Sequence, residues 1–180
     1  NLLHVLRHEK YANVFSAVFS QDGRRVVTAF GNTARIWDTS SGNLTRVLRH
    51  SDWVKASISQ DGRHVVTASI DGRARVWDAS SGEMTNIHSH GKDYVESAEF
   101  SPDGRRVVSC GSEGPAHVWD ASSGTSTRTL LLGDGRPLYD AKFSQDGLRV
   151  TAYDVYVHKA ATMWDVKTGR RLWPKTSSIK

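Results

Sequence analysis

The chain has 180 residues, with 24 lysines and arginines against 19 aspartates and glutamates, which gives a formal net charge of +5. Six tryptophans, five tyrosines and five phenylalanines carry too much apolar surface for a disordered chain. No apolar run approaches the roughly 18 residues that a membrane span needs, and a single cysteine, Cys110, excludes an internal disulfide framework. We expect one globular domain, 1–180, in the cytoplasm and without membrane contact. Because the chain starts at Asn1 rather than Met, we also expect a fragment or a processed product.

Two short markers recur along the chain with the same period. Asp-Gly occurs at 22–23, 61–62, 103–104 and 146–147, and Trp-Asp occurs at 37–38, 77–78, 119–120 and 164–165. The Trp-Asp copies are spaced by 40, 42 and 45 residues, which indicates a four-fold internal repeat. The expected repeats span approximately 3–43, 44–83, 84–125 and 126–172.

Each repeat has the pattern of a small antiparallel sheet, seen best in the second one. Residues 54–58 alternate between polar and apolar side chains, as a half-buried strand does, and Asp61-Gly62 is typical of a hairpin turn. Residues 65–69 follow as a buried strand, 74–77 as a third strand and 85–88 as a polar outer strand. Four strands fill the period and leave no room for a helix, so we predict an all-β fold.

The period, the Trp-Asp dipeptide and the Asp-Gly turns resemble the WD40 family over practically the whole chain. The resemblance implies WD40 β-propeller blades, here four four-stranded antiparallel blades. The closely similar copies look like bacterial WD40 arrays, which often lie beside kinase, NTPase or protease modules. It also implies a structural hydrogen-bond tetrad, which the second repeat matches with His50, Thr67, Asp71 and Trp77. The third repeat has Glu113 in place of the aspartate, the first lacks the acid, and the fourth lacks the histidine.

Three groups of residues invite a chemical interpretation. His50, Thr67 and Asp71 have the composition of a catalytic triad, but they coincide with the structural tetrad. Cys110 occupies the small-residue position of a buried strand and is expected to be a packed, inert thiol. His88-x-His90 has the spacing of a chelating pair on a strand but lacks a third ligand at a persuasive spacing. We therefore predict no enzyme, no cofactor and no metal.

A binding surface is the remaining function. In the family, ligands commonly bind the top face, through residues that open the first strand of each blade and through the residue before the turn acid. The first position assigns to a protein or peptide ligand the residues Asn13, Phe15, Trp53, Lys55, Tyr94, Glu96, Pro137 and Tyr139, and the second adds Ile70 and Ser112. Exposed aromatics suit such a contact because they bury a large area at low entropic cost. Packing between blades is the alternative role of these side chains.

Two other functions stay open. One is a structural assembly unit with no dedicated ligand. The other is nucleic-acid binding through Arg24, Arg25, Arg105 and Arg106, which the scattered distribution of arginines disfavours and for which we expect no specific gel shift.

Assembly is predicted from the number of blades. WD40-like sequences usually close with about seven or eight blades, so a four-blade arc leaves two apolar blade faces bare. Residues 2–8 copy the outer-strand segment 45–50, although no blade precedes them in this chain. We predict a homodimer, an eight-bladed ring in which these residues compete with the short candidate strand 170–173, which Pro174 ends.

Overall fold

The computed structural model describes residues 4–8, 14–132, 137–153 and 161–173, and it places four antiparallel sheets of four strands in them. The first sheet contains β1 (Val14–Phe19), β2 (Arg25–Phe30), β3 (Thr33–Asp38) and β4 (Leu44–Arg49). The second contains β5 (Val54–Ile58), β6 (His64–Ser69), β7 (Arg73–Asp78) and β8 (Met84–Ser89). The third contains β9 (Val95–Phe100), β10 (Arg106–Gly111), β11 (Ala116–Asp120) and β12 (Ser126–Leu130). The fourth contains β13 (Ala141–Phe143), β14 (Arg149–Tyr153), β15 (Ala161–Asp165) and β16 (Arg171–Trp173).

The predicted all-β fold is confirmed, and each sheet is one blade with its strands in chain order. The four strands expected in the second repeat agree with β5 to β8 to within one residue at each end. The sheets group each outer strand with the three strands before it, whereas the expected repeat boundaries group it with the three that follow. No helix occurs in the described ranges, and thus none that is long and apolar enough to cross a membrane.

The Asp-Gly turns form a recurring connection between the first and second strands of each sheet. In the second sheet, the Ser59 hydroxyl donates to the Asp61 carboxylate at 2.6 Å, and the Gly62 amide donates to the Ser59 carbonyl at 2.9 Å. Gly62 has a φ of +69°, a conformation that an L side chain would strain. The sequence Ser-x-Asp-Gly therefore fixes the hairpin locally, before any packing between sheets.

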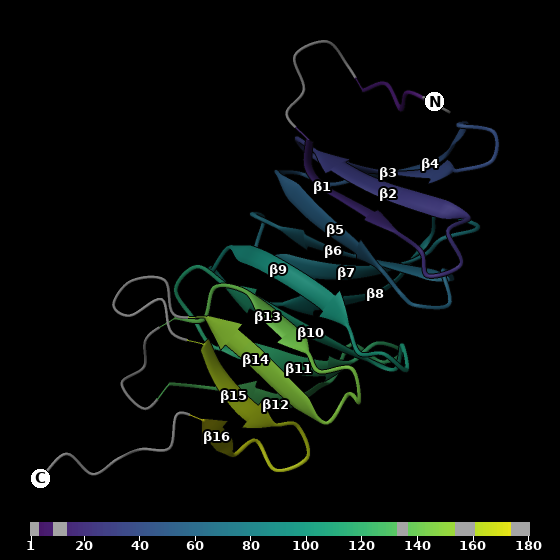
Figure 1. The fold of residues 1–180 in the computed structure, drawn as a ribbon. Helices are drawn as coiled ribbons and strands as arrows, with labels where there is room; N and C mark the ends of the chain where they lie inside the picture. The colour runs from purple at the N-terminus through teal and green to yellow at the C-terminus, as the bar shows by residue number, and fades with distance from the viewer. Residues whose placement is uncertain (1–3, 9–13, 133–136, 154–160, 174–180) are drawn as a thin grey trace, which may run out of the picture.

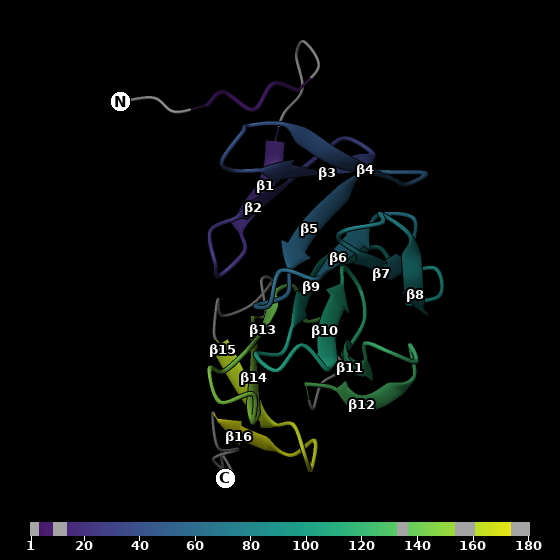
Figure 2. The same cartoon turned by 90° about the vertical axis from the view of Figure 1, so that its right-hand side faces the viewer.

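The sheets stack face to face into an open arc, with the first blade at one end and the fourth at the other (Figures 1 and 2). The second strand of each of the first three blades is almost completely buried, whereas the outer strands β4, β8 and β12 are mostly exposed. The first strands lie side by side along the inner side of the arc, where β1, β5 and β9 contact one another in sequence.

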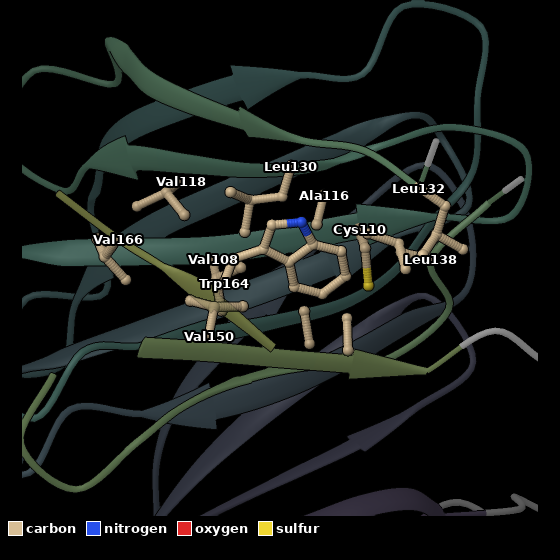
Figure 3. Packing of buried hydrophobic residues seen from close by; sticks show 12 residues of the cluster. Val108, Cys110, Ala116, Val118, Leu130, Leu132, Leu138, Val150, Trp164 and Val166 are labelled. Atoms are coloured by element: carbon tan, nitrogen blue, oxygen red, sulfur yellow. The ribbon is translucent and has the colours of Figure 1, made fainter. Parts of the chain in front are cut away.

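The hydrophobic core is divided into clusters between neighbouring blades. Between the third and fourth blades, the Trp164 side chain is enclosed by Val108, Cys110, Val118 and Leu130, all of which are fully buried (Figure 3). Similar clusters join the first blade to the second and the second to the third. Each blade is therefore stabilised by its neighbours, and the inner rims of the blades are held in fixed relative positions.

Candidate binding surface

The residues that precede or open the first strands are positioned by a repeated backbone contact. The Ile70 amide donates to the Trp53 carbonyl at 3.0 Å, and the Ser112 amide donates to the Tyr94 carbonyl at 3.1 Å. In the fourth blade the Tyr139 amide donates to the Tyr153 carbonyl at 2.9 Å. Trp53 and Tyr94 are thus presented at equivalent places directly in front of β5 and β9, whereas Tyr139 lies two residues before β13 and donates its amide instead of accepting at its carbonyl. We call Phe15, Trp53, Tyr94 and Tyr139 the aromatic rim.

Phe15 and Trp53 bring the first two blades together at this rim. Their ring centroids are 4.9 Å apart with an interplanar angle of 31°, yet Trp53 remains 55% exposed and Phe15 39%. They border a hollow of about 250 Å³. Its lining consists of Phe15, Trp53, Val54, Lys55, Ala68, Ile70, Val95 and Glu96. This hollow is mainly apolar, with one cation and one anion at its edge.

A second, larger hollow of about 440 Å³ adjoins the first along the inner strands. Here the Lys55 ammonium lies 3.4 Å from the Glu96 carboxylate and 5.9 Å from the centroid of the Tyr139 ring. Lys55 is half exposed, so this ion pair contributes little to stability and orients two charges towards solvent. The lining is completed by Ser16, Ala56, Ser97, Ala98, Asp140 and Lys142.

The structure thus brings together six of the ten predicted binding residues, namely Phe15, Trp53, Lys55, Ile70, Glu96 and Tyr139. Tyr94 is 52% exposed beside them but lines neither hollow. The Ser112 hydroxyl donates to the Asp93 carboxylate at 3.0 Å, so its side chain has a structural partner. Pro137 is partly buried outside both linings, and Asn13 lies outside the described residues.

Several lining residues are missing from the sequence prediction. Ser97, Asp140 and Lys142 lie on or next to the first strands of the last two blades. The alternation along a strand does not single them out, because Ser97 directly follows the predicted Glu96 and Asp140 directly follows the predicted Tyr139. The prediction considered the residues that open each first strand and those before the turn acid.

Three of the four residues of the tetrad expected in the second repeat share one hydrogen-bonded hydroxyl. His50 Nε2 lies 2.8 Å from the Thr67 hydroxyl oxygen, to which the Trp77 indole also donates at 2.9 Å. The expected fourth bond is wrong, because the Asp71 carboxylate accepts from the Arg75 guanidinium at 2.8 Å and from the Ser51 hydroxyl at 2.8 Å. Arg75 is a stronger donor and competes successfully for the carboxylate.

The environment of His50 keeps the imidazole neutral. Burial and, to a smaller extent, the Arg75 cation lower its pKa to about 4, although the Asp71 carboxylate opposes the shift. In the third blade, His90 Nε2 lies 2.8 Å from the Ser109 hydroxyl oxygen, which also accepts from the Trp119 indole at 3.0 Å. Both histidines therefore hold a hydroxyl next to a tryptophan, and neither has the arrangement of a catalytic base.

The acid of the third blade comes from a residue that the sequence prediction missed. Asp93, in the loop before β9, accepts from the Ser112 hydroxyl and from the Glu113 amide, each at 3.0 Å. The Glu113 side chain is exposed, so its expected role as the replacement acid is wrong. A Cβ atom on Gly111 would overlap the Asp93 carboxylate, which explains the glycine at this point.

The structure adds His117 to the His88-x-His90 pair, with ring centroids of the three side chains 4.8 to 5.5 Å apart. Even so, the described part of the chain holds no group of three or more histidine, cysteine or acidic side chains arranged to bind a metal ion. Cys110 is fully buried with its Sγ 3.0 Å from the Ser97 Oγ, and burial raises the pKa of the thiol to about 12. The thiol is packed as predicted.

Two of the four arginines considered for nucleic-acid binding have structural roles. The Arg25 guanidinium donates to the Gly62 carbonyl at 2.6 Å, and the Arg106 guanidinium donates to the Gly147 carbonyl at 3.1 Å. Each contact joins one blade to the turn of the next. Arg24 and Arg105 are exposed on the equivalent turns of the first and third blades, with the second blade between them.

Stacked four-stranded antiparallel blades with a Trp-Asp dipeptide ending the third strand define the chain as a protein of the β-propeller class. The family described as "WD domain, G-beta repeat" (WD40) matches residues 1–38, 42–78 and 82–120. The chain belongs to the WD40 family, whose members are generally non-catalytic scaffolds that mediate protein–protein interactions. A comparison with curated proteins gave no match.

Proposed function

We propose that the chain is a non-catalytic interaction module that binds a protein or peptide at the aromatic rim. The observation that carries this proposal is the Phe15–Trp53 pair, which stays substantially exposed at the edge of two adjoining hollows. Isolated exposed apolar residues are ordinary, but aromatics gathered around a concavity are typical of binding hot spots. We place this function in the cytoplasm.

The two hollows suit an extended ligand with both apolar and polar groups. An apolar side chain would fill the first hollow between Phe15, Trp53 and Ile70, where it displaces water from apolar walls. The ligand's polar groups would lie over Lys55 and Glu96, each of which can exchange its partner for a ligand group of opposite charge. Because the packed blades hold the backbone of this surface in place, little conformational entropy of the chain is lost when a ligand binds.

The proposal is tested with Trp53→Ala and Tyr94→Ala in a pull-down that compares the variants with the wild-type chain. Both side chains are more than half exposed, so their removal should lower the free energy of unfolding by no more than about 1 kcal/mol, and the chain stays folded while the partner is lost. If binding persists in both variants, or if binding and folding are lost together, the rim is not the binding surface. Ile87→Ala, an exposed residue on outer strand β8, is the matched control.

A second candidate function, a self-assembling half-propeller, is favoured by the free face of the first blade. Phe19 is 66% exposed there, whereas its counterparts in the next two blades, Ile58 and Phe100, are 8% and 6% exposed between blades. A side chain of this size at this position is otherwise covered by a preceding blade. We propose a homodimer of two arcs as the assembly that covers it.

A further inference from the structure

Two of the three seams between neighbouring blades contain an arginine that reaches from the start of one blade's second strand to the Asp-Gly turn of the next blade. At the first seam, between the first and second blades, the Arg25 guanidinium donates to the Gly62 carbonyl at 2.6 Å and to the Ser80 hydroxyl at 3.3 Å. At the third seam, between the third and fourth blades, the Arg106 guanidinium donates to the Gly147 carbonyl at 3.1 Å. Both turn glycines are buried.

A second arginine, on the outer strand, bridges each of the same two seams. The Arg46 guanidinium donates to the Ser81 carbonyl at 3.0 Å, and the Arg128 guanidinium donates to the Lys167 carbonyl at 3.1 Å. Both carbonyls belong to the turn that follows Trp-Asp in the next blade. At the first seam, Arg25 and Arg46 line the same hollow of about 260 Å³. Guanidinium groups of the chain itself therefore occupy this part of a seam.

The second seam, between the second and third blades, has neither arginine. His64 stands at the position of Arg25, and Asn86 stands at that of Arg46. Asn86 still donates to the Ala121 carbonyl at 3.2 Å, but both side chains are shorter than arginine. The hollow that they line is larger, about 560 Å³. Its lining also includes Val76, Thr85, Gly104, Arg105, Asp120 and Ser122.

The turn glycine of the second seam lacks the hydrogen bond that its counterparts have. No described residue donates to the Gly104 carbonyl, whereas the Gly62 and Gly147 carbonyls each accept from an arginine. Gly104 is partly exposed and lines the hollow, whereas both counterparts are buried. The second seam therefore keeps the acceptor of the repeated contact without its donor.

We propose that this hollow binds an arginine side chain of a partner protein, whose guanidinium takes the position that Arg25 has at the first seam. Its N–H groups would donate to the Gly104 carbonyl and the Ser122 hydroxyl, the counterparts of the two acceptors of Arg25. A planar guanidinium suits two such acceptors because its N–H groups point in fixed directions. The hollow shares no lining residue with the two hollows at the aromatic rim, so this site is additional to the proposed function there.

The charges around the hollow are compatible with a bound cation. The Asp120 carboxylate lines it and accepts from the Ser122 hydroxyl at 2.6 Å. Arg105 also lines it and is exposed. Arg63 stands at the same place at the first seam, where the Arg25 guanidinium nevertheless binds. One neighbouring arginine therefore does not exclude a guanidinium from this position.

The probe for the experiment is N-acetyl-arginine amide, titrated into the 15N-labelled chain and followed by NMR. We expect saturable shifts of the Gly104 and Ser122 amide signals at millimolar probe concentrations. The citrulline analogue has almost the same shape but no charge, and it should bind about five-fold more weakly or less, because hydrogen bonds from a charged donor are stronger. The absence of a saturable shift at these two amides overturns the proposal, as does equal binding of the two probes.

His64→Arg supplies the arginine that the other two seams contain. Its guanidinium should reach the Gly104 carbonyl, so the folded variant should bind the probe about ten-fold more weakly or less. Asn86→Arg, which restores the outer-strand arginine, is the second blocking variant. Thr129→Arg adds the same charge at an exposed position of β12 and should bind like the wild-type chain. Unchanged binding in both blocking variants overturns the proposal.

The reverse substitutions, Arg25→His together with Arg46→Asn, give the first seam the residues of the second. We expect this double variant to gain a second site, with saturable shifts at the Gly62 amide. A folded double variant without these shifts contradicts the role assigned to the two arginines. Trp53→Ala should bind the probe like the wild-type chain, so failure here and failure of peptide binding at the aromatic rim are distinguishable.

Discussion

The ring of Phe15 lies 4.9 Å from the ring of Trp53, although the two residues belong to different blades. Phe15 is on β1, and Trp53 precedes β5 in the next sheet. Their contact therefore depends on how the first two blades pack, and it joins two exposed aromatics into one continuous apolar surface. A ligand that touches one ring would also meet the other.

The energy of this contact is measurable with a double-mutant cycle of Phe15→Ala and Trp53→Ala. Aromatic pairs contribute about 0.5–1.5 kcal/mol beyond the area that they bury. We expect a coupling of about 0.5–1 kcal/mol in the free energy of urea unfolding, at the low end because both rings are partly solvated. The control cycle, Trp53→Ala with Ile87→Ala, should show none. A coupling near zero for the aromatic pair would mean that the rings do not interact in solution.

Thr67→Val should destabilise the second blade at almost constant side-chain volume. The substitution removes the hydroxyl that His50 and Trp77 share and leaves their buried nitrogens without that partner. Each unsatisfied group costs about 1–3 kcal/mol, so we expect a loss of about 2–4 kcal/mol in the free energy of unfolding. Thr125→Val, at an exposed turn, should change it by less than about 0.5 kcal/mol. Equal effects of the two substitutions would contradict the role of the hydroxyl.

Stability should decrease as the pH falls from about 6.5 to 5. Burial lowers the pKa of His50 to about 4 and that of His90 to about 3, so the folded chain keeps both neutral while the unfolded chain takes up protons. The unfolded state binds more protons in this range, so the folded state loses free energy as the pH falls, by up to about 2 kcal/mol for each histidine at pH 5. Urea unfolding at pH 7 and pH 5 measures the change.

The matched variants for this pH dependence are His50→Gln and His90→Gln. Each removes one titrating group, so each should reduce the difference in unfolding free energy between pH 7 and pH 5. A difference that stays the same in both variants would assign the pH dependence to other groups.

Cys110 should react with a thiol reagent only after unfolding. Its side chain is fully buried, and burial raises the pKa of the thiol to about 12, so almost no thiolate is present at neutral pH. We expect no reaction with dithionitrobenzoate within an hour in buffer and complete reaction in concentrated urea. Rapid labelling of the folded chain would show that the cluster around Trp164 opens.

Prediction from the sequence is most successful where structure is determined locally. Asp61-Gly62 indicates a hairpin because serine, aspartate and glycine form that turn among themselves, and the pair of Trp77 with Thr67 recurs in the first and third blades at a spacing of nine or ten residues. The predicted roles of Asp71 and Glu113 are wrong, because these contacts depend on which groups compete for a partner in space. Arg75 is the competing donor to the Asp71 carboxylate, and in the third blade the Asp93 carboxylate accepts from the Ser112 hydroxyl and the Glu113 amide. Neither Arg75 nor Asp93 has a feature in the sequence that predicts its contact.

The candidate surface also has one part that the sequence predicts locally and one part that depends on how the blades pack. The repeat places Trp53 and Tyr94 at equivalent strand starts, directly before β5 and β9, as the period predicts. Lys55 lies between Glu96 and Tyr139 because of the angle at which the blades pack, and the spacing of residues in the sequence does not predict that angle.

Calorimetric titration of a peptide ligand tests the proposed binding function most directly. The ligand is selected from a random peptide library on the wild-type chain and titrated into wild type, Trp53→Ala and the control Ile87→Ala. A hot-spot aromatic contributes about 2 kcal/mol or more, so Trp53→Ala should weaken the affinity by about thirty-fold or more, and Ile87→Ala should leave it unchanged. Equal affinities for wild type and Trp53→Ala, with all three proteins folded, would contradict binding at the aromatic rim.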